Sequence, residues 1–162
     1  MIRHARSLFL STMLLVAALV PITPSVRATA SEPLVMIINT SVSLKDITLP
    51  MLRRAFEGSP VEYASGKRII PFNALSESSD RVLFDRAVLG LTPDEMARFW
   101  VDQRIRSAAQ APRTIGTPEL AVRVIASLPG AITYVRESKA DRTVRVLSIE
   151  GKSPEDEDYL LR

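Results

Sequence analysis

The sequence has 162 residues, of which 46% are hydrophobic, 24% charged and 6% aromatic, a composition typical of a globular chain rather than a disordered or fibrous one. Because 3 of the 21 basic residues lie within the first 30, the other 132 residues carry 18 basic and 18 acidic side chains. This balance argues against binding to a nucleic-acid backbone, which requires a basic excess, and we expect no nucleic-acid partner. A length of 132 residues suits one domain.

The residue types present also limit the chemistry. Cysteine is absent, and the only histidine is His4, within the first 30 residues. Ser-His-Asp and Cys-His nucleophilic sites and Cys/His zinc sites are therefore excluded from the rest of the chain. The densest acidic cluster, at residues 155–158, lacks the glycine and the alternation of a calcium loop. We expect a protein that is not an enzyme and that uses no cofactor or metal.

Residues 1–30 have the features of a signal peptide. Arg3 and Arg6 precede an apolar stretch at residues 8–20, and a small-x-small pattern ends with Ala28 and Ala30. The alternative is an uncleaved membrane anchor, but this stretch of 13 residues is shorter than the roughly 20 that span a bilayer as a helix. We predict cleavage after Ala30. Because an exported domain without disulfides is unusual outside bacteria, we predict a periplasmic location.

Strands and helices alternate along the remaining chain. In order, the apolar spacing and turn residues predict a buried strand at 34–38, a helix at 49–56, a strand at 68–72, a helix that follows the serine-rich segment 76–80 and ends at 89, a helix from 92 to about 103, a polar loop at 104–116, a helix at 117–128, and strands at 131–135 and 144–149. This order predicts an α/β fold with a mixed, largely parallel sheet. We expect residues 31–150 to form the domain and residues 151–162 to form a charged, mobile tail.

The helix at residues 92–103 has the clearest start signal. Thr92, Pro93 and Glu95 form a capping box with proline at the first helical position. Later in this helix, the aromatic residue Trp100 lies at helical spacing from Met96. This spacing predicts a helix packed in the core, and stacking of Trp100 on a ligand is the alternative.

A candidate ligand site follows the strand predicted at residues 68–72. Ser76, Ser78 and Ser79 precede a helix, and ligands of open α/β sheets gather where strands end and helices begin. Their hydroxyls and the helix dipole can hold an oxyanion. The alternative is that these serines only cap the helix. Asp80 favours this alternative, because its carboxylate competes with a bound anion.

The polar loop offers a second candidate site. Arg104, Arg106 and Arg113 can grip an oxyanion in a bidentate manner. A solvated surface explains them more simply, because the acidic residues Asp94 and Asp102 are near in sequence.

Residues 34–135 resemble the phosphate-type substrate-binding proteins of ABC transporters, which have the type 2 periplasmic-binding fold. Four stretches carry the resemblance: Val-Met-Ile-Ile-Asn at 35–39 with Ser-Val at 41–42; residues 47–58, which are similar to the family's "Leu-Thr…Leu…Ile-Phe-x-Gly" helix; residues 76–84, which are similar to its phosphate loop and following helix; and residues 129–135, which are similar to its "Pro-Gly-Ala-Ile-Gly-Tyr-Val" strand. The resemblance implies a three-layer α/β sandwich that corresponds to one lobe of the family fold.

The sequence departs from the family at the residues that would bind the ligand. Transport members of the family are longer and close two lobes over the anion, whereas this chain matches one lobe. In the phosphate loop, Ser78 keeps the hydroxyl of the family, but Ser79 stands where glycine is usual and Asp80 where a hydroxyl residue is usual. Thr133 replaces the glycine of the last strand.

The resemblance implies an exported, non-enzymatic substrate-binding-like protein. Its ligand would be phosphate or another small oxyanion, held by Ser76, Ser78, Ser79 and Arg81. Its partner would be an inner-membrane ABC transporter or a sensor, and a homodimer could rebuild a two-lobed cleft. The alternative, which Asp80 favours, is a periplasmic accessory or interaction protein built on a degenerate lobe that binds no ligand.

Overall fold

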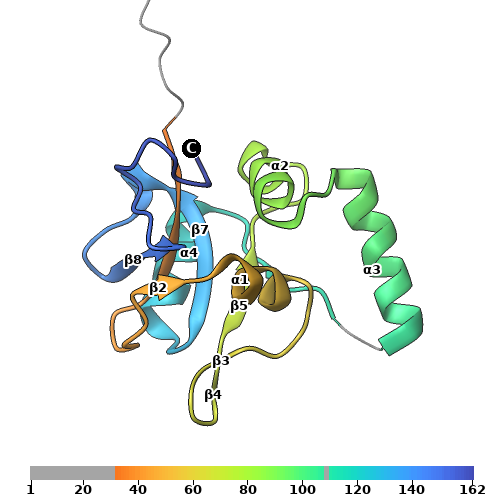
Figure 1. Cartoon of the computed structure of the whole chain (residues 1–162), viewed down its shortest axis with the longest axis horizontal. Helices are drawn as coiled ribbons and strands as arrows, with labels where there is room; N and C mark the ends of the chain where they lie inside the picture. Colours follow the sequence, from red (N-terminus) through yellow and green to blue (C-terminus); the bar gives the residue numbers. More distant parts are fainter. Residues whose placement is uncertain (1–31, 108–109) are drawn as a thin grey trace, which may run out of the picture.

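The computed structural model describes residues 32–107 and 110–162 of the chain, and the predicted signal peptide lies outside them. A six-stranded sheet in the order β2-β8-β1-β7-β5-β6 forms the centre of the molecule (Figure 1). The strands are β1 (Leu34–Asn39), β2 (Asp46–Ile47), β5 (Ile70–Asn73), β6 (Arg113–Thr114), β7 (Ala131–Arg136) and β8 (Val144–Ile149). β1 runs antiparallel to β7 and β8, and the other three pairs, β2–β8, β5–β7 and β5–β6, are parallel. The predicted mixed, largely parallel sheet is confirmed.

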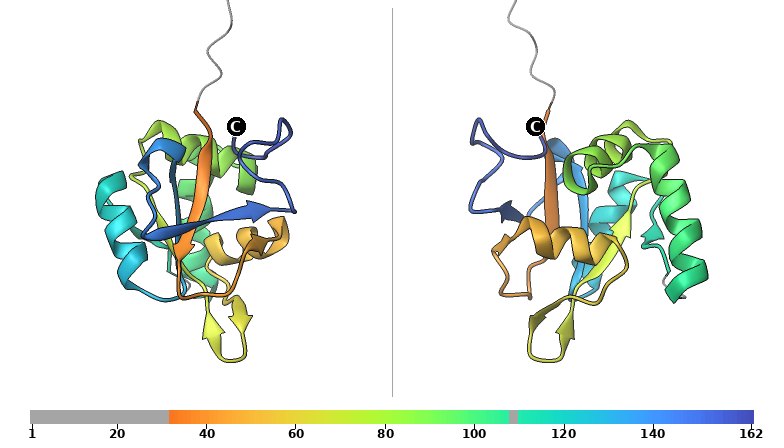
Figure 2. Two further views of the ribbon diagram at one scale, coloured as in Figure 1. Left: turned by 90° about the vertical axis from the view of Figure 1, so that its left-hand side faces the viewer. Right: turned by 45° about the vertical axis from the view of Figure 1, so that its right-hand side comes forward.

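Helices cover both faces of this sheet (Figure 2). They are α1 (Leu49–Phe56), α2 (Ser79–Phe84), the π-helix η1 (Asp85–Leu89), α3 (Pro93–Ser107), α4 (Pro118–Ser127) and the short 3₁₀-helix η2 (Glu137–Lys139). The core on one face contains the buried side chains of α1, α2 and η1, and the core on the other contains those of α4. The molecule is therefore a three-layer α/β sandwich. None of these helices is long and apolar enough to cross a membrane.

The central strand β1 explains why there are two cores. Successive side chains of a strand point to opposite faces of a sheet. Leu34, Met36 and Ile38 pack into the core beneath α1 and α2, whereas Val35 and Ile37 pack into the core beneath α4. All five side chains are fully buried, as the uninterrupted apolar stretch in the sequence predicted.

The helix starts follow the capping signals in the sequence. The side chain of Thr117 accepts a hydrogen bond from the backbone of Leu120 at the start of α4, at 3.2 Å. At the start of α3, the backbone N–H of Thr92 donates to Glu95 Oε2 at 2.8 Å, and the backbone N–H of Glu95 donates to Thr92 Oγ1 at 3.4 Å. The predicted capping box is confirmed in both directions.

Three predictions for α3 and the segment that follows it are wrong. The helix extends to Ser107 instead of ending near residue 103, and the expected loop at 104–116 contains β6. Within α3 only Met96 is buried, so the helix does not lie in the core. It stands at the side of the molecule beyond the other helices, with Val101 and Ile105 60% and 79% exposed (Figure 1).

The sequence analysis missed the shortest strands. Besides β2 and β6, these are β3 (Glu62–Ala64) and β4 (Lys67–Arg68), which form a separate hairpin. The strand predicted at 68–72 is divided between β4 and β5. Strands of two or three residues are too short to show a periodic pattern, so only their pairing partners reveal them.

The C-terminal segment is part of the domain and not a mobile tail. Tyr159 and Leu161 are 3% and 0% exposed and belong to the core beneath α1 and α2. The backbone N–H of Leu34 donates to the carbonyl of Leu161 at 2.9 Å, which ties the end of the chain to the start of β1. The sequence prediction was wrong because the acidic residues at 155–158 dominate the composition of this segment, and the apolar residues that follow them are few.

Candidate functional site

A small cavity of about 80 Å³ lies where β5 and β6 end, between the first turns of α2 and α4. Asn73 is the last residue of β5, Ser78 is the N-cap of α2, and Thr117 is the N-cap of α4. Parallel α/β sheets place their ligands at this kind of edge, outside the carboxyl ends of the strands. The cavity is lined by Asn73, Ala74, Leu75, Ser78, Asp80, Ile115, Gly116, Thr117, Pro118, Ala121, Thr133, Tyr134 and Val135.

The inner wall of the cavity carries polar groups that are fixed by hydrogen bonds. The hydroxyl of Tyr134 donates to Asn73 Oδ1 at 3.3 Å and accepts from the backbone N–H of Ala74 at 3.4 Å. Burial raises the pKa of Tyr134, so the phenol stays protonated at neutral pH. Thr133 donates to the carbonyl of Phe72 at 2.9 Å. These contacts connect β7 to the end of β5.

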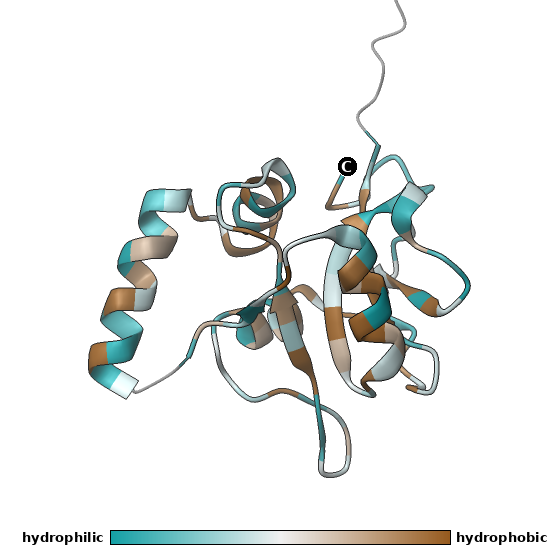
Figure 3. Ribbon diagram, turned by 180° about the vertical axis from the view of Figure 1, so that it is seen from behind, coloured by the Kyte–Doolittle hydropathy of each residue, from teal (hydrophilic) through white to brown (hydrophobic). Residues whose placement is uncertain are grey.

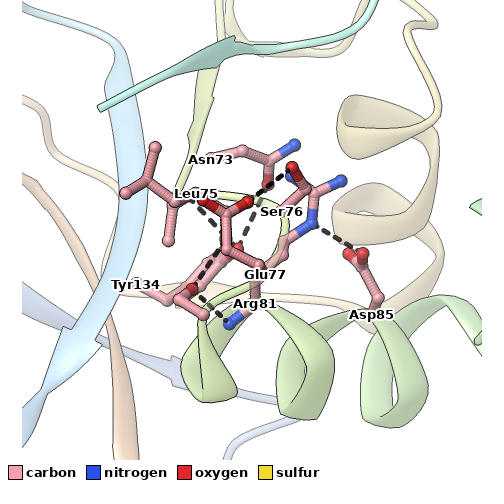
Figure 4. A network of polar contacts seen from close by, with 9 residues as sticks. Asn73, Leu75, Ser76, Glu77, Arg81, Asp85 and Tyr134 are labelled. Carbon is pink, nitrogen blue, oxygen red and sulfur yellow. Dashed lines mark hydrogen bonds and ion pairs between the residues drawn. The ribbon is translucent and has the colours of Figure 1, made fainter. Parts of the chain in front are cut away.

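Of the three serines predicted to bind the ligand, only Ser78 lines the cavity. Its hydroxyl donates to the carbonyl of Leu75 at 2.7 Å and accepts from the backbone N–H of Arg81 at 3.2 Å. Ser76 is exposed and donates to Glu77 Oε2 at 3.2 Å (Figure 4). Ser79 lines a different surface groove, beside Leu83. The structure therefore does not bring the three hydroxyls together.

Arg81, the predicted cationic ligand, is buried and does not line the cavity. Its Nε donates to Asp85 Oδ2 at 2.6 Å, and the two side chains are only 9% and 5% exposed (Figure 4). Burial raises the pKa of Asp85, and the charge of Arg81 partly opposes this shift. Asp85 Oδ1 is buried and has no hydrogen-bond partner among the described residues. In this arrangement the guanidinium of Arg81 neutralises a buried carboxylate.

The sequence analysis missed Arg136, which forms an ion pair at the edge of the cavity. Arg136 is the last residue of β7, and its Nε and Nη2 lie 2.8 and 2.7 Å from Asp80 Oδ1. The side chains of Arg136 and Asp80 are 24% and 22% exposed, so this pair is partly buried and partly in contact with solvent. Arg136 also donates to the backbone carbonyl of Glu32. The signal available in the sequence was its place at the carboxyl end of a predicted strand.

The arginines of the second candidate site do not form a cluster at the cavity. Arg106 is paired with Asp102 on α3 at 2.9 Å, Arg104 is exposed on the same helix, and Arg113 is exposed in β6. None of the three lines the cavity. The described residues also contain no group of three or more side chains that could hold a metal ion.

The comparison with solved structures identifies the fold. The structure matches an ABC-type phosphate transport receptor from Vibrio cholerae with a TM-score of 0.59 and 13% identity, over 76% of this chain and 48% of that one. It matches PstS from Borrelia burgdorferi with a TM-score of 0.59 and 16% identity, over 76% and 49%. The fold therefore matches that of about half of each of these two proteins.

A third phosphate-type structure, described as a phosphate ABC transporter substrate-binding protein with bound phosphate, comes from Clostridium perfringens. It matches with a TM-score of 0.61 and 16% identity, over 76% of this chain and 47% of that one. The chain thus spans about half the length of the phosphate-type proteins it matches. No protein-family model matches the sequence. No curated protein matches it either.

Proposed function

We propose that this protein is an exported, single-lobe binding protein that takes phosphate or another small oxyanion into the cavity at the ends of β5 and β6. The observation that carries the proposal is the place of the cavity, at the carboxyl edge of the parallel strands and beside the N-cap Thr117 of α4. A helix N-terminus attracts anions because its peptide dipoles point their positive end outward. A volume of about 80 Å³ admits a few water molecules or one small anion.

The residues that hold the anion differ in part from those predicted. Ser78 remains a ligand candidate, because it lines the cavity. Arg136 is a better cationic partner than Arg81, since its ion pair is partly exposed whereas that of Arg81 is buried. In this proposal an incoming anion replaces the carboxylate of Asp80 on the guanidinium of Arg136. Arg136 suits this exchange because its planar fork can bind an oxyanion through two N–H groups.

The biological partner follows from the phosphate-type fold. The matched proteins from Vibrio cholerae and Clostridium perfringens are described as components of phosphate ABC transport. For this chain we propose a periplasmic location after cleavage at Ala30, and delivery of the anion to an inner-membrane transporter or sensor.

Substitution of Asp80 by asparagine tests the anion site. In D80N the competing carboxylate is removed and Arg136 is released, so we expect the Kd for inorganic phosphate to fall about tenfold, which corresponds to about 1.4 kcal/mol. The matched control is D94N, which makes the same change to a carboxylate in the first turn of another helix, α3. Isothermal titration of the protein purified after expression of the full chain measures both. An unchanged Kd in D80N would contradict the proposed exchange.

A panel of anions tests whether any ligand binds. At about 100 times its Kd, a ligand adds about 2.7 kcal/mol to the free energy of unfolding, which raises the melting temperature by several degrees for a domain of this size. Phosphate, sulfate, molybdate and small carboxylates are compared at fixed ionic strength. A selective shift with one anion supports a binding protein.

The second candidate function is an accessory or interaction protein without a small ligand. The observation that favours it is that the polar groups at the start of α2 already have hydrogen-bond partners within the protein. The hydroxyl of Ser78 has two partners, and the carboxylate of Asp80 is held by Arg136. The absence of any thermal shift in both the wild-type protein and D80N would support this alternative. Pull-down of periplasmic and inner-membrane proteins would then identify the partner.

A further inference from the structure

The outer face of α3 carries exposed apolar side chains. Val101 and Ile105 are one turn apart and are 60% and 79% exposed, and Ala97 lies one turn before Val101 and is also exposed. In Figure 3 the ribbon of α3 carries brown, hydrophobic bands between teal, hydrophilic ones. Together with Phe99 and Leu91 they line a shallow groove along the helix. The opposite side of α3 contributes Met96 to the protein interior. The helix therefore has one face toward the domain and one apolar face toward solvent.

Charged residues run along one side of this apolar face in alternating order. In chain order they are Glu95, Arg98, Asp102 and Arg106, and all four are exposed. Their spacing of three, four and four residues keeps them on one flank of the helix. The signs read negative, positive, negative, positive. In the reverse chain direction the signs are positive, negative, positive, negative. An antiparallel copy of the helix therefore places a charge of opposite sign across from each of these residues.

From this pattern we infer that the protein forms a two-fold homodimer through antiparallel packing of α3 against α3 of a second copy. The pairing is centred near Val101, so that Val101 lies beside its symmetry mate and Ile105 beside Ala97 of the copy. The same alignment places Glu95 opposite Arg106 and Arg98 opposite Asp102. In a parallel two-fold pair the charged flanks of the two helices would lie on opposite sides of the interface, so these four charges would not pair with each other.

The balance of charge on α3 favours a second copy of this chain over a membrane surface or a strongly charged partner. The exposed ionic residues of α3 are three acids and three arginines: Asp94, Glu95, Asp102, Arg98, Arg104 and Arg106. A helix that lies on an anionic membrane surface has a basic excess, which is absent here. A strongly charged partner of either sign would also gain little from a neutral helix. An identical helix complements both signs at once, as the symmetry of a two-fold interface requires.

The inference is independent of the anion site, because α3 does not line that cavity. Sedimentation equilibrium of the protein purified after expression of the full chain tests it. We expect a concentration-dependent monomer–dimer equilibrium that I105E shifts to monomer by at least tenfold in Kd. The matched control is L120E, since Leu120 is a 41% exposed apolar residue on α4. A monomer at every concentration, or a dimer that I105E leaves intact, would overturn the inference.

Charge exchange tests the antiparallel pairing itself. R98E and D102R each oppose like charges across the interface and should weaken the dimer, whereas the double variant R98E/D102R restores opposite charges and should recover it. Circular dichroism reports whether α3 remains folded in each variant. If the double variant is as weak as the single variants while the helix is intact, α3 does not pair in this alignment.

The absence of cysteine provides a direct measurement of proximity. The variant V101C places one thiol near the two-fold axis, and mild oxidation should join two copies by a disulfide. The control L120C places a thiol on α4, away from the axis. Efficient cross-linking of V101C but not L120C is expected. Equal cross-linking of both variants would indicate random collision and would contradict the proposed interface.

Discussion

At the scale of single residues, two adjacent charges in α2 have opposite environments. Asp80 forms its ion pair with Arg136 in contact with solvent, whereas the next residue, Arg81, is buried with Asp85. Breaking the first pair should cost less than breaking the second, because its side chains remain partly in contact with water. The second is harder to break, because a charge left alone in the interior is costly. Of these two ion pairs, the one between Asp80 and Arg136 is the better suited to exchange with a ligand.

Removal of Arg81 should destabilise the fold strongly. The variant R81M keeps most of the aliphatic part of the side chain. It removes the guanidinium that forms the ion pair with the carboxylate of Asp85. We expect the free energy of unfolding at pH 7 to fall by about 3 to 5 kcal/mol, as measured by urea denaturation. The control R86M changes an exposed arginine five residues away and should cost less than about 0.5 kcal/mol. A loss for R81M as small as for R86M would show that the buried pair is not a stabilising contact.

Asp85 should also make stability depend on pH. Burial raises its pKa in the folded protein above its ordinary value of 3.8. The folded state therefore holds this proton more tightly than the unfolded state, and the free energy of unfolding falls as the pH rises from about 4 through the raised pKa. D85N has no such proton. We expect the stability of the wild-type protein relative to D85N to decrease from pH 4 to pH 7, and a constant difference across this range would contradict the raised pKa.

At the scale of elements, α3 and α4 begin with similar caps but differ in packing. Thr92 and Thr117 each accept a hydrogen bond from a backbone N–H three residues later. α4 buries Ala121, Val122 and Ile125, whereas α3 buries only Met96. An element with few buried side chains opens locally without unfolding the whole domain. The two helices should therefore respond differently to the same substitution.

Removal of each cap tests this difference. T117A should lower the free energy of global unfolding by about 1 kcal/mol, the usual cost of losing a threonine N-cap. T92A should lower it less, and should instead increase amide hydrogen exchange within α3. Urea denaturation and exchange measured by NMR separate the two effects. A global loss in T92A equal to that in T117A would show that α3 unfolds together with the core.

The sequence predicted those elements whose signals are local. Caps, turns and apolar spacing act within a few residues, which is why α1, α4 and β8 were located to within two residues. The short strands β2 and β6 depend on partners far along the chain, and no pattern of two residues reveals them. The site was predicted in the same uneven way. Ser78 could be predicted as a site residue because it comes soon after the end of a predicted strand. The contact between Asp80 and Arg136 could not, because it joins residues 56 positions apart. The burial of Arg81 depends on how α2 packs, which is decided by tertiary structure.

At the scale of the whole molecule, the two ends of the described chain meet at the start of β1, a strand in the middle of the sheet. β1, the first strand, lies between β7 and β8, the last two. Residues that follow β8 then return to the start of β1, where Leu161 accepts the hydrogen bond from Leu34. The start of β1 and the C-terminus lie side by side at the top of both views of Figure 2. The final residues thus complete the core that begins at β1.

Truncation after Asp158 should consequently unfold a large part of the population. It removes Tyr159 and Leu161, and full burial of one large apolar side chain contributes about 1.5 to 3 kcal/mol. The loss of both is a large fraction of the roughly 5 to 15 kcal/mol by which a domain is stable. Urea denaturation of the truncated chain should show a much lower midpoint than the intact chain. The control D158N removes only the exposed ion pair between Asp158 and Lys152, and should cost less than about 1 kcal/mol. If the truncated chain is as stable as D158N, the buried residues at its end are dispensable and the mobile tail expected from the sequence would be the better description; a large loss confined to the truncation would show that these last residues belong to the folded lobe.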